Sequence, residues 1–248
     1  MIKRYILLLI LISSIGFANA IVTSILTVHG NKATVKVSNI NIGISGFIVK
    51  DLKGGHSYII NSAVVVGYNK TSHIAILKLG KFHELKQPYL PTLKLRASAG
   101  DKAVLAFGYD RALLIAPNKQ TYFKITHALP SLEWVHPDIF AMLLSENGHP
   151  RPLKSDFTQM CHISSVGLLY IYLKQKLITI DCLSMKVLQI SPAPLKSRPA
   201  QLPFYNRVGK IQSNWFGAGS HRLRVYAPYY LKLLQKYNKN NEELKGIR

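Results

Sequence analysis

The chain has 248 residues, of which 48% are hydrophobic, so it is long enough for one large domain or two small ones with a core. Lys and Arg outnumber Asp and Glu by 32 to 11, which gives a formal net charge of +21 at pH 7. Because the eleven acids are spread thinly, this composition argues against a catalytic site built on paired carboxylates.

Residues 1–20 have the composition of a signal peptide. Lys3 and Arg4 form a positive start, an apolar run follows, and Ala18-Asn19-Ala20 is a small-x-small cleavage site. The run is too short for an ordinary membrane-spanning helix, and no cysteine follows it, which excludes a lipoprotein signal. We therefore expect a secreted chain that starts at Ile21 and lies in the periplasm, in the outer membrane or on the cell surface. An uncleaved anchor is the alternative.

The excess of positive charge indicates an anionic partner. Without Lys3 and Arg4, 30 of the 32 Lys and Arg remain against 11 acids. In a cytosolic protein this imbalance would suggest nucleic acid, but the export signal argues against that partner. Outside the cytoplasm the anionic candidates are lipid head groups, lipopolysaccharide, cell-wall polymers and host glycans. The alternative is that the charge only keeps the protein in solution.

Residues 21–117 have the alternating pattern of β-strands. Two hairpins are predicted, with turns at Gly30-Asn31 and Gly54-Gly55, and three more strands follow in HIAILKLG, AGDKAVLAF and ALLIAP. Seven short strands without a convincing helix predict a small β barrel or sandwich.

Residues 118–195 form a different module, in which helices precede strands. Helices are predicted over NKQTYFKITHAL, over the segment that begins at Pro137, and over PLKSDFTQMCHI. The run VGLLYIYLKQKLITIDCLSMKVLQI then predicts a strand, a tight turn at Lys174 to Lys176, and one or two further strands. The fold class is therefore α+β, with an N-terminal β barrel or sandwich module followed by a helix–strand module.

Residues 196–248 are predicted to form an extended strap and a basic tail. The predicted strap is the run SPAPLKSRPAQLP (residues 191–203), which is rich in proline and serine. In NWFGAGS, Trp215 and Phe216 form either an exposed aromatic ledge for a glycan or a protein, or a pair packed under a tight turn. The apolar spacing in PYYLKLLQKYNKNN predicts a helix that is either solvated or lies on an anionic membrane or a partner.

Two histidines lie in EWVHPDIFAMLLSENGHPRP, which we interpret as a helix with clear start and stop signals. Pro137 suits a first helical position, and Asn147-Gly148 suits a left-handed cap. His136 and His149 flank this helix roughly 20 Å apart by helical rise, too far to share a metal ion. The chain also lacks G-x-S-x-G, H-E-x-x-H and phosphate-binding glycine motifs. We expect no enzyme activity, no metal and no cofactor.

The two cysteines of the chain, Cys161 and Cys182, can form a disulfide if the protein is exported. A loop of about 21 residues closed in this way would contribute roughly 3 kcal/mol in the chain-entropy model. Two buried thiols are the alternative.

Five long segments are distinctive: GYDRALLIAPNKQTYFKI, EWVHPDIFAMLLSENGHPRPLKSDFTQMC, SVGLLYIYLKQKLITIDCLSMKVL, LPFYNRVGKI and NWFGAG. They resemble the N-terminal domain of the bacterial plasminogen-binding proteins of the PgbA and PgbB type, over about residues 21–230. The resemblance implies an exported or surface-associated protein of Gram-negative bacteria. It also implies binding of host plasminogen through lysines that kringle domains recognise, without enzymatic activity.

Kringle lysine sites pair a cation with a carboxylate, and the tail holds the only mixed-charge cluster of the last 53 residues. We therefore expect the plasminogen contact at Lys236, Lys239, Lys245, Arg248, Glu242 and Glu243. The longer relatives end in lysine, which the planar Arg248 imitates imperfectly. The Asn-rich tail is expected to bury little surface, so that its removal leaves the fold intact.

An alternative function is a structural component of the cell envelope. Such a protein would dock on anionic polymers or lipids through its positive charge, without binding plasminogen.

Overall fold

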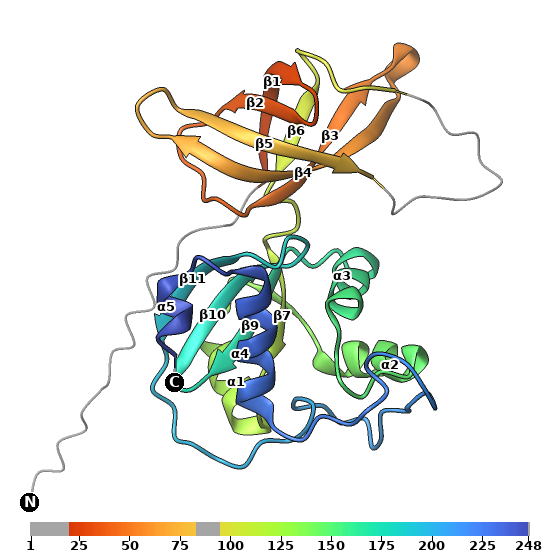
Figure 1. Cartoon of the computed structure of the whole chain (residues 1–248), viewed down its shortest axis with the longest axis vertical. Coiled ribbons are helices and arrows are strands. Elements are labelled where there is room, and N and C mark those ends of the chain that lie inside the picture. The colour runs from red at the N-terminus through yellow and green to blue at the C-terminus, as the bar shows by residue number, and fades with distance from the viewer. Residues whose placement is uncertain (1–19, 83–94, 248) are drawn as a thin grey trace, which may run out of the picture.

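The computed structural model describes residues 20–82 and 95–247. The predicted signal peptide lies almost wholly outside the described residues. Figure 1 shows a β barrel at one end of the molecule and a second sheet with helices at the other end, which confirms the predicted α+β class. In the described part of the chain, no helix has both the length and the hydropathy needed to span a bilayer.

Six antiparallel strands close into the barrel in the order β1-β2-β5-β4-β3-β6. Both predicted hairpins are present, and a short 3-10 turn, η1 (Lys53–Gly55), lies at the second one. Alternate side chains fill the interior, for example Val35, Val65 and Leu77, each with no exposed surface. The strands are β1 (Ile21–His29), β2 (Lys32–Lys36), β3 (Ser45–Asp51), β4 (Ser57–Asn69), β5 (Ile74–Lys81) and β6 (Lys102–Leu105).

The second sheet has five strands in the order β11-β10-β9-β7-β8. Strand β7 runs parallel to both β8 and β9, whereas β9, β10 and β11 form an antiparallel meander. The strands are β7 (Arg111–Ile115), β8 (Glu133–Val135), β9 (Leu168–Leu173), β10 (Lys176–Asp181) and β11 (Val187–Pro192).

Strand β7 corrects the sequence analysis, which assigned its residues to the N-terminal β module as a seventh strand. It pairs with β8 and β9 and not with any barrel strand. Residues 112–115 are all apolar and fully buried, because helices cover both faces of the second sheet. A strand buried on both faces has a continuous apolar run, whereas the barrel strands alternate.

Four helices of ten to twelve residues and one short helix cover this sheet. Helix α1 packs on the face that carries Leu114, and α2, α3 and α4 pack on the face that carries Leu113 and Ile115. Gly148 ends α2 in the left-handed conformation, as predicted. The helices are α1 (Lys119–Ala128), α2 (Pro137–Asn147), α3 (Lys154–Ile163), α4 (Tyr226–Tyr237) and α5 (Glu242–Lys245). Strand β8 and helix α5 were not predicted from the sequence.

A buried carboxylate joins the barrel to the second sheet. Asp181, at the end of β10, has no exposed surface. One of its oxygens accepts hydrogen bonds from the backbone N–H and the hydroxyl of Ser45 at 2.8 Å, and from the Tyr109 hydroxyl at 2.6 Å. Its other oxygen accepts from the Ser184 N–H at 2.7 Å. Burial and the adjacent Asp181 raise the pKa of Tyr109 well above its usual value, so this phenol stays a donor.

Cys161 in α3 and Cys182 after β10 form a disulfide, with their Cα atoms 5.9 Å apart. Both residues belong to the core between the helices and the second sheet. The bond therefore ties a helix to the sheet that it covers.

We expect Cys161→Ala/Cys182→Ala to lower the free energy of unfolding by about 3 kcal/mol, since the bond closes a loop of about 21 residues in the unfolded chain. Urea denaturation of the oxidised protein and of the double variant measures this difference. Thiol titration of the freshly isolated, denatured protein is the control and should find no free thiol. Two titrating thiols would contradict the bond.

Candidate functional site

The five described members of the predicted binding site lie close together at the end of the chain. We call Lys236, Lys239, Glu242, Glu243 and Lys245 the C-terminal cluster; all five side chains are exposed. Arg248 lies outside the described residues.

Local sequence explains how the C-terminal cluster forms. Helix α4 ends at Tyr237, and the chain turns through three asparagines before α5 begins. The Asn241 side chain accepts a hydrogen bond from the Leu244 N–H at 2.8 Å, which caps α5. The two glutamates lie in the first turn of α5 and Lys245 in its last turn, as the helix dipole favours.

The charges of the C-terminal cluster are only partly paired with one another. Lys245 Nζ lies 2.7 Å from Glu242 Oε1, in an exposed ion pair. Lys236, Lys239 and Glu243 form no ion pair with any described residue. The cluster therefore offers ammonium and carboxylate groups to an outside partner.

Packing fixes the C-terminal cluster on the second sheet. Asn238 Nδ2 donates to Met185 O at 2.9 Å, and its Oδ1 accepts from the Val187 N–H at 2.9 Å. Leu244 has no exposed surface and Ile247 is 4% exposed, both inside the core of the second sheet. The prediction that the tail buries little surface is therefore wrong. The missed signal was the apolar pair Leu244, in α5, and Ile247, just after its C-cap Gly246, in an otherwise polar chain end.

The two histidines of the α2 segment lie at opposite ends of the helix. His136 caps α2 and accepts a hydrogen bond from the Asp138 N–H at 3.2 Å. His149 Nδ1 lies 2.8 Å from the buried Asp156 Oδ1. Within residues 20–82 and 95–247, no group of three His, Cys, Asp or Glu side chains could hold a metal ion.

Asp138 pairs with a residue that follows the strap. Arg207 Nε lies 2.7 Å from its Oδ2, and the Arg207 N–H donates to its Oδ1 at 2.7 Å. Burial alone would raise the pKa of Asp138, but the hydrogen bonds from Arg207 outweigh it, so the pKa is lowered. This ion pair fastens the segment that follows the strap to the start of α2.

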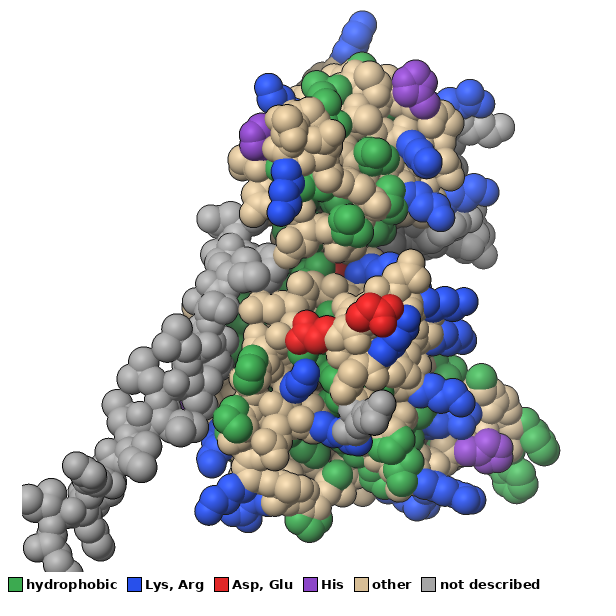
Figure 2. Space-filling model, turned by 60° about the vertical axis from the view of Figure 1, so that its left-hand side comes forward, with side chains coloured by type: hydrophobic (Ala, Val, Ile, Leu, Met, Phe, Trp, Pro, Cys, Tyr) green, Lys and Arg blue, Asp and Glu red, His purple; other side chains and the backbone are tan. Residues whose placement is uncertain are grey.

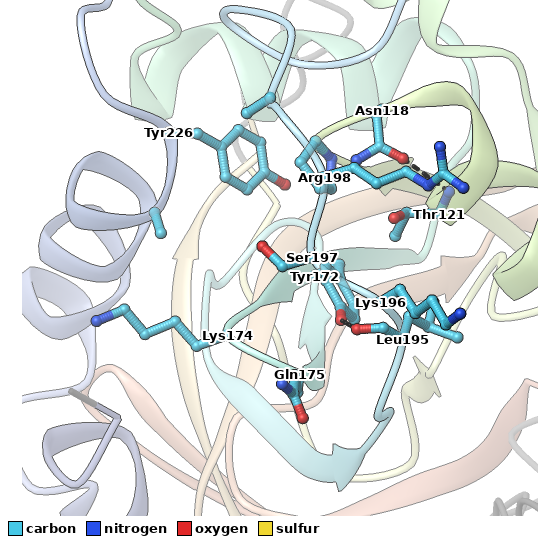
Figure 3. Close-up of a pocket in the computed structure, with 13 residues that line it drawn as sticks. Asn118, Thr121, Tyr172, Lys174, Gln175, Leu195, Lys196, Ser197, Arg198 and Tyr226 are labelled. Atoms are coloured by element: carbon cyan, nitrogen blue, oxygen red, sulfur yellow. Dashed lines mark hydrogen bonds between the residues drawn. The ribbon is translucent and has the colours of Figure 1, made fainter.

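A cavity of about 450 Å³ lies under the strap, shown in Figure 3, and was not predicted from the sequence. Lys174, Lys196 and Arg198 lie at its rim, and its described lining residues include no acid. Asn118 caps α1 by accepting from the Thr121 N–H at 3.0 Å, yet its buried amide nitrogen has no hydrogen-bond partner among the described residues.

Trp215 and Phe216 are 92% and 87% exposed. Of the two predicted alternatives, the exposed aromatic ledge is therefore correct, and the pair packed under a tight turn is wrong.

Comparison with known proteins gives a consistent result. The sequence profile of the family described as plasminogen-binding protein pgbA N-terminal matches residues 20–234. The chain is 28% identical over 202 residues to the plasminogen-binding protein PgbA of Helicobacter pylori, in strain J99 and also in strain 26695. Each match covers 80% of this chain and 43% of the relative, so the chain spans less than half the length of these relatives. No solved structure matches.

Proposed function

The chain belongs to the family of plasminogen-binding protein pgbA N-terminal domains, and from this premise we propose that it is an exported, non-enzymatic protein that binds plasminogen. The contact is made by the C-terminal cluster. The signal-peptide composition of residues 1–20 supports export, and export would bring the protein to plasminogen outside the cell.

The observation that supports this proposal is the mixed charge of the C-terminal cluster on a fixed base. A kringle lysine site needs an ammonium and a carboxylate together. Lys239 forms no ion pair within the described chain, so its charge is available without breaking an internal contact. Asn238 and Leu244 anchor the segment on both sides of Lys239, so this segment loses little conformational entropy on binding. The profile of the family matches residues 20–234, so the C-terminal cluster lies just beyond the matched region.

Surface plasmon resonance over immobilised plasminogen tests the proposal. We expect residues 21–248 to bind and a lysine analogue, 6-aminohexanoic acid, to compete. Lys236→Ala/Lys239→Ala/Lys245→Ala should weaken binding at least about tenfold, which is ~1.4 kcal/mol. The fold should tolerate this change, because the one ion pair that it removes is exposed.

The matched control removes the same charge from the barrel. Lys32, Lys78 and Lys81 are exposed residues of β2 and β5, and we expect their triple alanine variant to bind like the unchanged protein. Equal losses in the two triple variants, or binding that resists the lysine analogue, would show that plasminogen responds only to net charge. That result would contradict a kringle site at the C-terminal cluster.

A further inference from the structure

The segment that carries Trp215 and Phe216 is held in one conformation by hydrogen bonds across its base. We call residues 213–220 the Trp–Phe loop. The Ser213 hydroxyl donates to Ser220 O at 2.5 Å, and the Ser220 hydroxyl donates to Gly217 O at 2.8 Å. The two aromatic side chains therefore stand at the tip of a closed loop.

The base of the Trp–Phe loop is also fastened to the end of α2. The Asn214 N–H donates to Gly148 O at 3.0 Å, and its side-chain amide donates to Asn147 O at 2.9 Å. The contact is so close that a Cβ atom on Gly148 would lie 2.2 Å from Asn214 Cγ. On the other side, the Arg151 N–H donates to Gly219 O at 3.2 Å. The fold thus supports a loop whose tip contributes almost nothing to the core.

A basic cavity follows directly after the Trp–Phe loop. It has a volume of about 700 Å³ and is lined by four cations and an exposed histidine. We call the cations the arginine group: Arg151, Arg222, Arg224 and Lys232. None of them forms an ion pair with an acid in the part of the chain that the structure describes. Val225, which is 54% exposed, adds an apolar side chain at the same place. Figure 2 shows how far Lys and Arg outnumber acids on one face of the molecule.

We infer that the Trp–Phe loop and the arginine group form a docking face for an anionic lipid bilayer. Tryptophan and phenylalanine on a projecting loop can enter the interfacial layer of a bilayer, where amphipathic aromatic rings are favoured. Guanidinium groups nearby can bind the phosphates of the lipid head groups, and each cation near an anionic surface adds to the affinity. The partner is a lipid surface because the two aromatic side chains stand almost fully exposed beside unpaired cations. A sugar ring would instead need an aromatic platform in a concave site with polar side chains that can accept its hydroxyl protons.

This inference goes beyond the proposed function, because it uses a different part of the molecule. Arg222 and Arg224 precede α4, whereas Lys239 and the α5 residues of the C-terminal cluster follow it. With twelve residues, α4 spans about 18 Å between these two ends, and Lys232 lies within it, one turn before Lys236. A molecule docked on a bilayer through the Trp–Phe loop would keep the C-terminal cluster away from the lipid and accessible to a large protein.

Vesicle co-sedimentation tests the docking face with the chain from residue 21. We expect binding to vesicles of phosphatidylglycerol and phosphatidylcholine, weakened by salt, and little binding to pure phosphatidylcholine. Trp215→Ala/Phe216→Ala should reduce partitioning at least about tenfold. Arg222→Gln/Arg224→Gln should reduce it by about 30-fold.

Two matched controls lie on the barrel. Val22→Ala/Ile76→Ala shortens two exposed apolar side chains, and Lys32→Gln/Lys78→Gln removes two exposed cations. Both should partition like the unchanged protein. Losses in the controls equal to those in the loop variants would overturn the inference, because net charge and general hydrophobicity would then explain the binding.

Fluorescence locates the contact independently of affinity. The chain has two tryptophans, and Trp134 is partly buried with its Nε1–H donating to Leu129 O at 3.2 Å. In a Trp134→Phe variant, anionic vesicles should shift the Trp215 emission to the blue, and brominated lipids should quench it. No shift with vesicles, or a shift only with a soluble lipopolysaccharide core oligosaccharide, would overturn the lipid inference. Plasminogen binding by the same variants should be unchanged, so the two proposals fail separately.

Discussion

Asp181→Ala is expected to lower the free energy of unfolding by about 4 kcal/mol, one of the largest effects of any single substitution in this chain. The carboxylate is fully buried and accepts four hydrogen bonds, two from Ser45 and one each from Tyr109 and Ser184. Its removal takes the acceptor from three buried donors and from the partly buried Ser184 N–H, and each buried hydrogen bond lost in this way costs about 1–3 kcal/mol before water enters the space. Because typical domains are stable by about 5–15 kcal/mol, this change should remove a large fraction of the total stability.

Urea denaturation measures this loss. Asp110→Ala is the matched control, since it removes an exposed carboxylate near the same junction and should change stability by less than about 0.5 kcal/mol. Tyr109→Phe and Ser45→Ala remove donors one at a time and should each cost about 1–2 kcal/mol. An Asp181→Ala protein as stable as Asp110→Ala would show that the carboxylate does not hold the barrel on the second sheet.

Deletion of residues 238–248 is expected to destabilise the protein by several kcal/mol, in contrast to the sequence-based prediction that the tail is dispensable. Leu244 and Ile247 are buried in the core of the second sheet, and the burial of each such side chain is worth about 1.5–3 kcal/mol. The deletion also removes Asn238, which bonds Met185 O and the Val187 N–H.

Thermal and urea denaturation of the truncated and complete chains test this expectation. Leu244→Ala alone should cost about 3 kcal/mol. Glu242→Ala/Lys245→Ala is the control, because it removes an exposed pair from the same helix and should cost less than about 1 kcal/mol. Equal melting of the truncated and complete chains would contradict the packing of the tail. If the tail is packed, a truncated protein that fails to bind plasminogen says nothing about the C-terminal cluster, and point substitutions have to be used.

Much of the fold follows from local sequence. Gly30-Asn31 marks a real hairpin turn, Asn118 caps α1, and Gly148 ends α2, because each of these signals depends on backbone conformation within a few residues. The apolar spacing of α4 also predicted its helix correctly. Of the candidate site, the sequence predicted the grouping of Lys239, Glu242 and Lys245, since seven successive positions around one short helix must lie close together.

The sequence by itself therefore determined most of the elements, though not β8 or α5, together with the α+β class and the family of this protein. The tertiary structure alone decided where β7 belongs, what Asp181 holds, and that Leu244 is buried while Trp215 is exposed. Each of these depends on partners far away in the chain: Ser45 and Asp181 are 136 residues apart. A local pattern fixes the direction in which a side chain points along its own element, but burial depends on which distant element covers that direction, and only the folded chain supplies it.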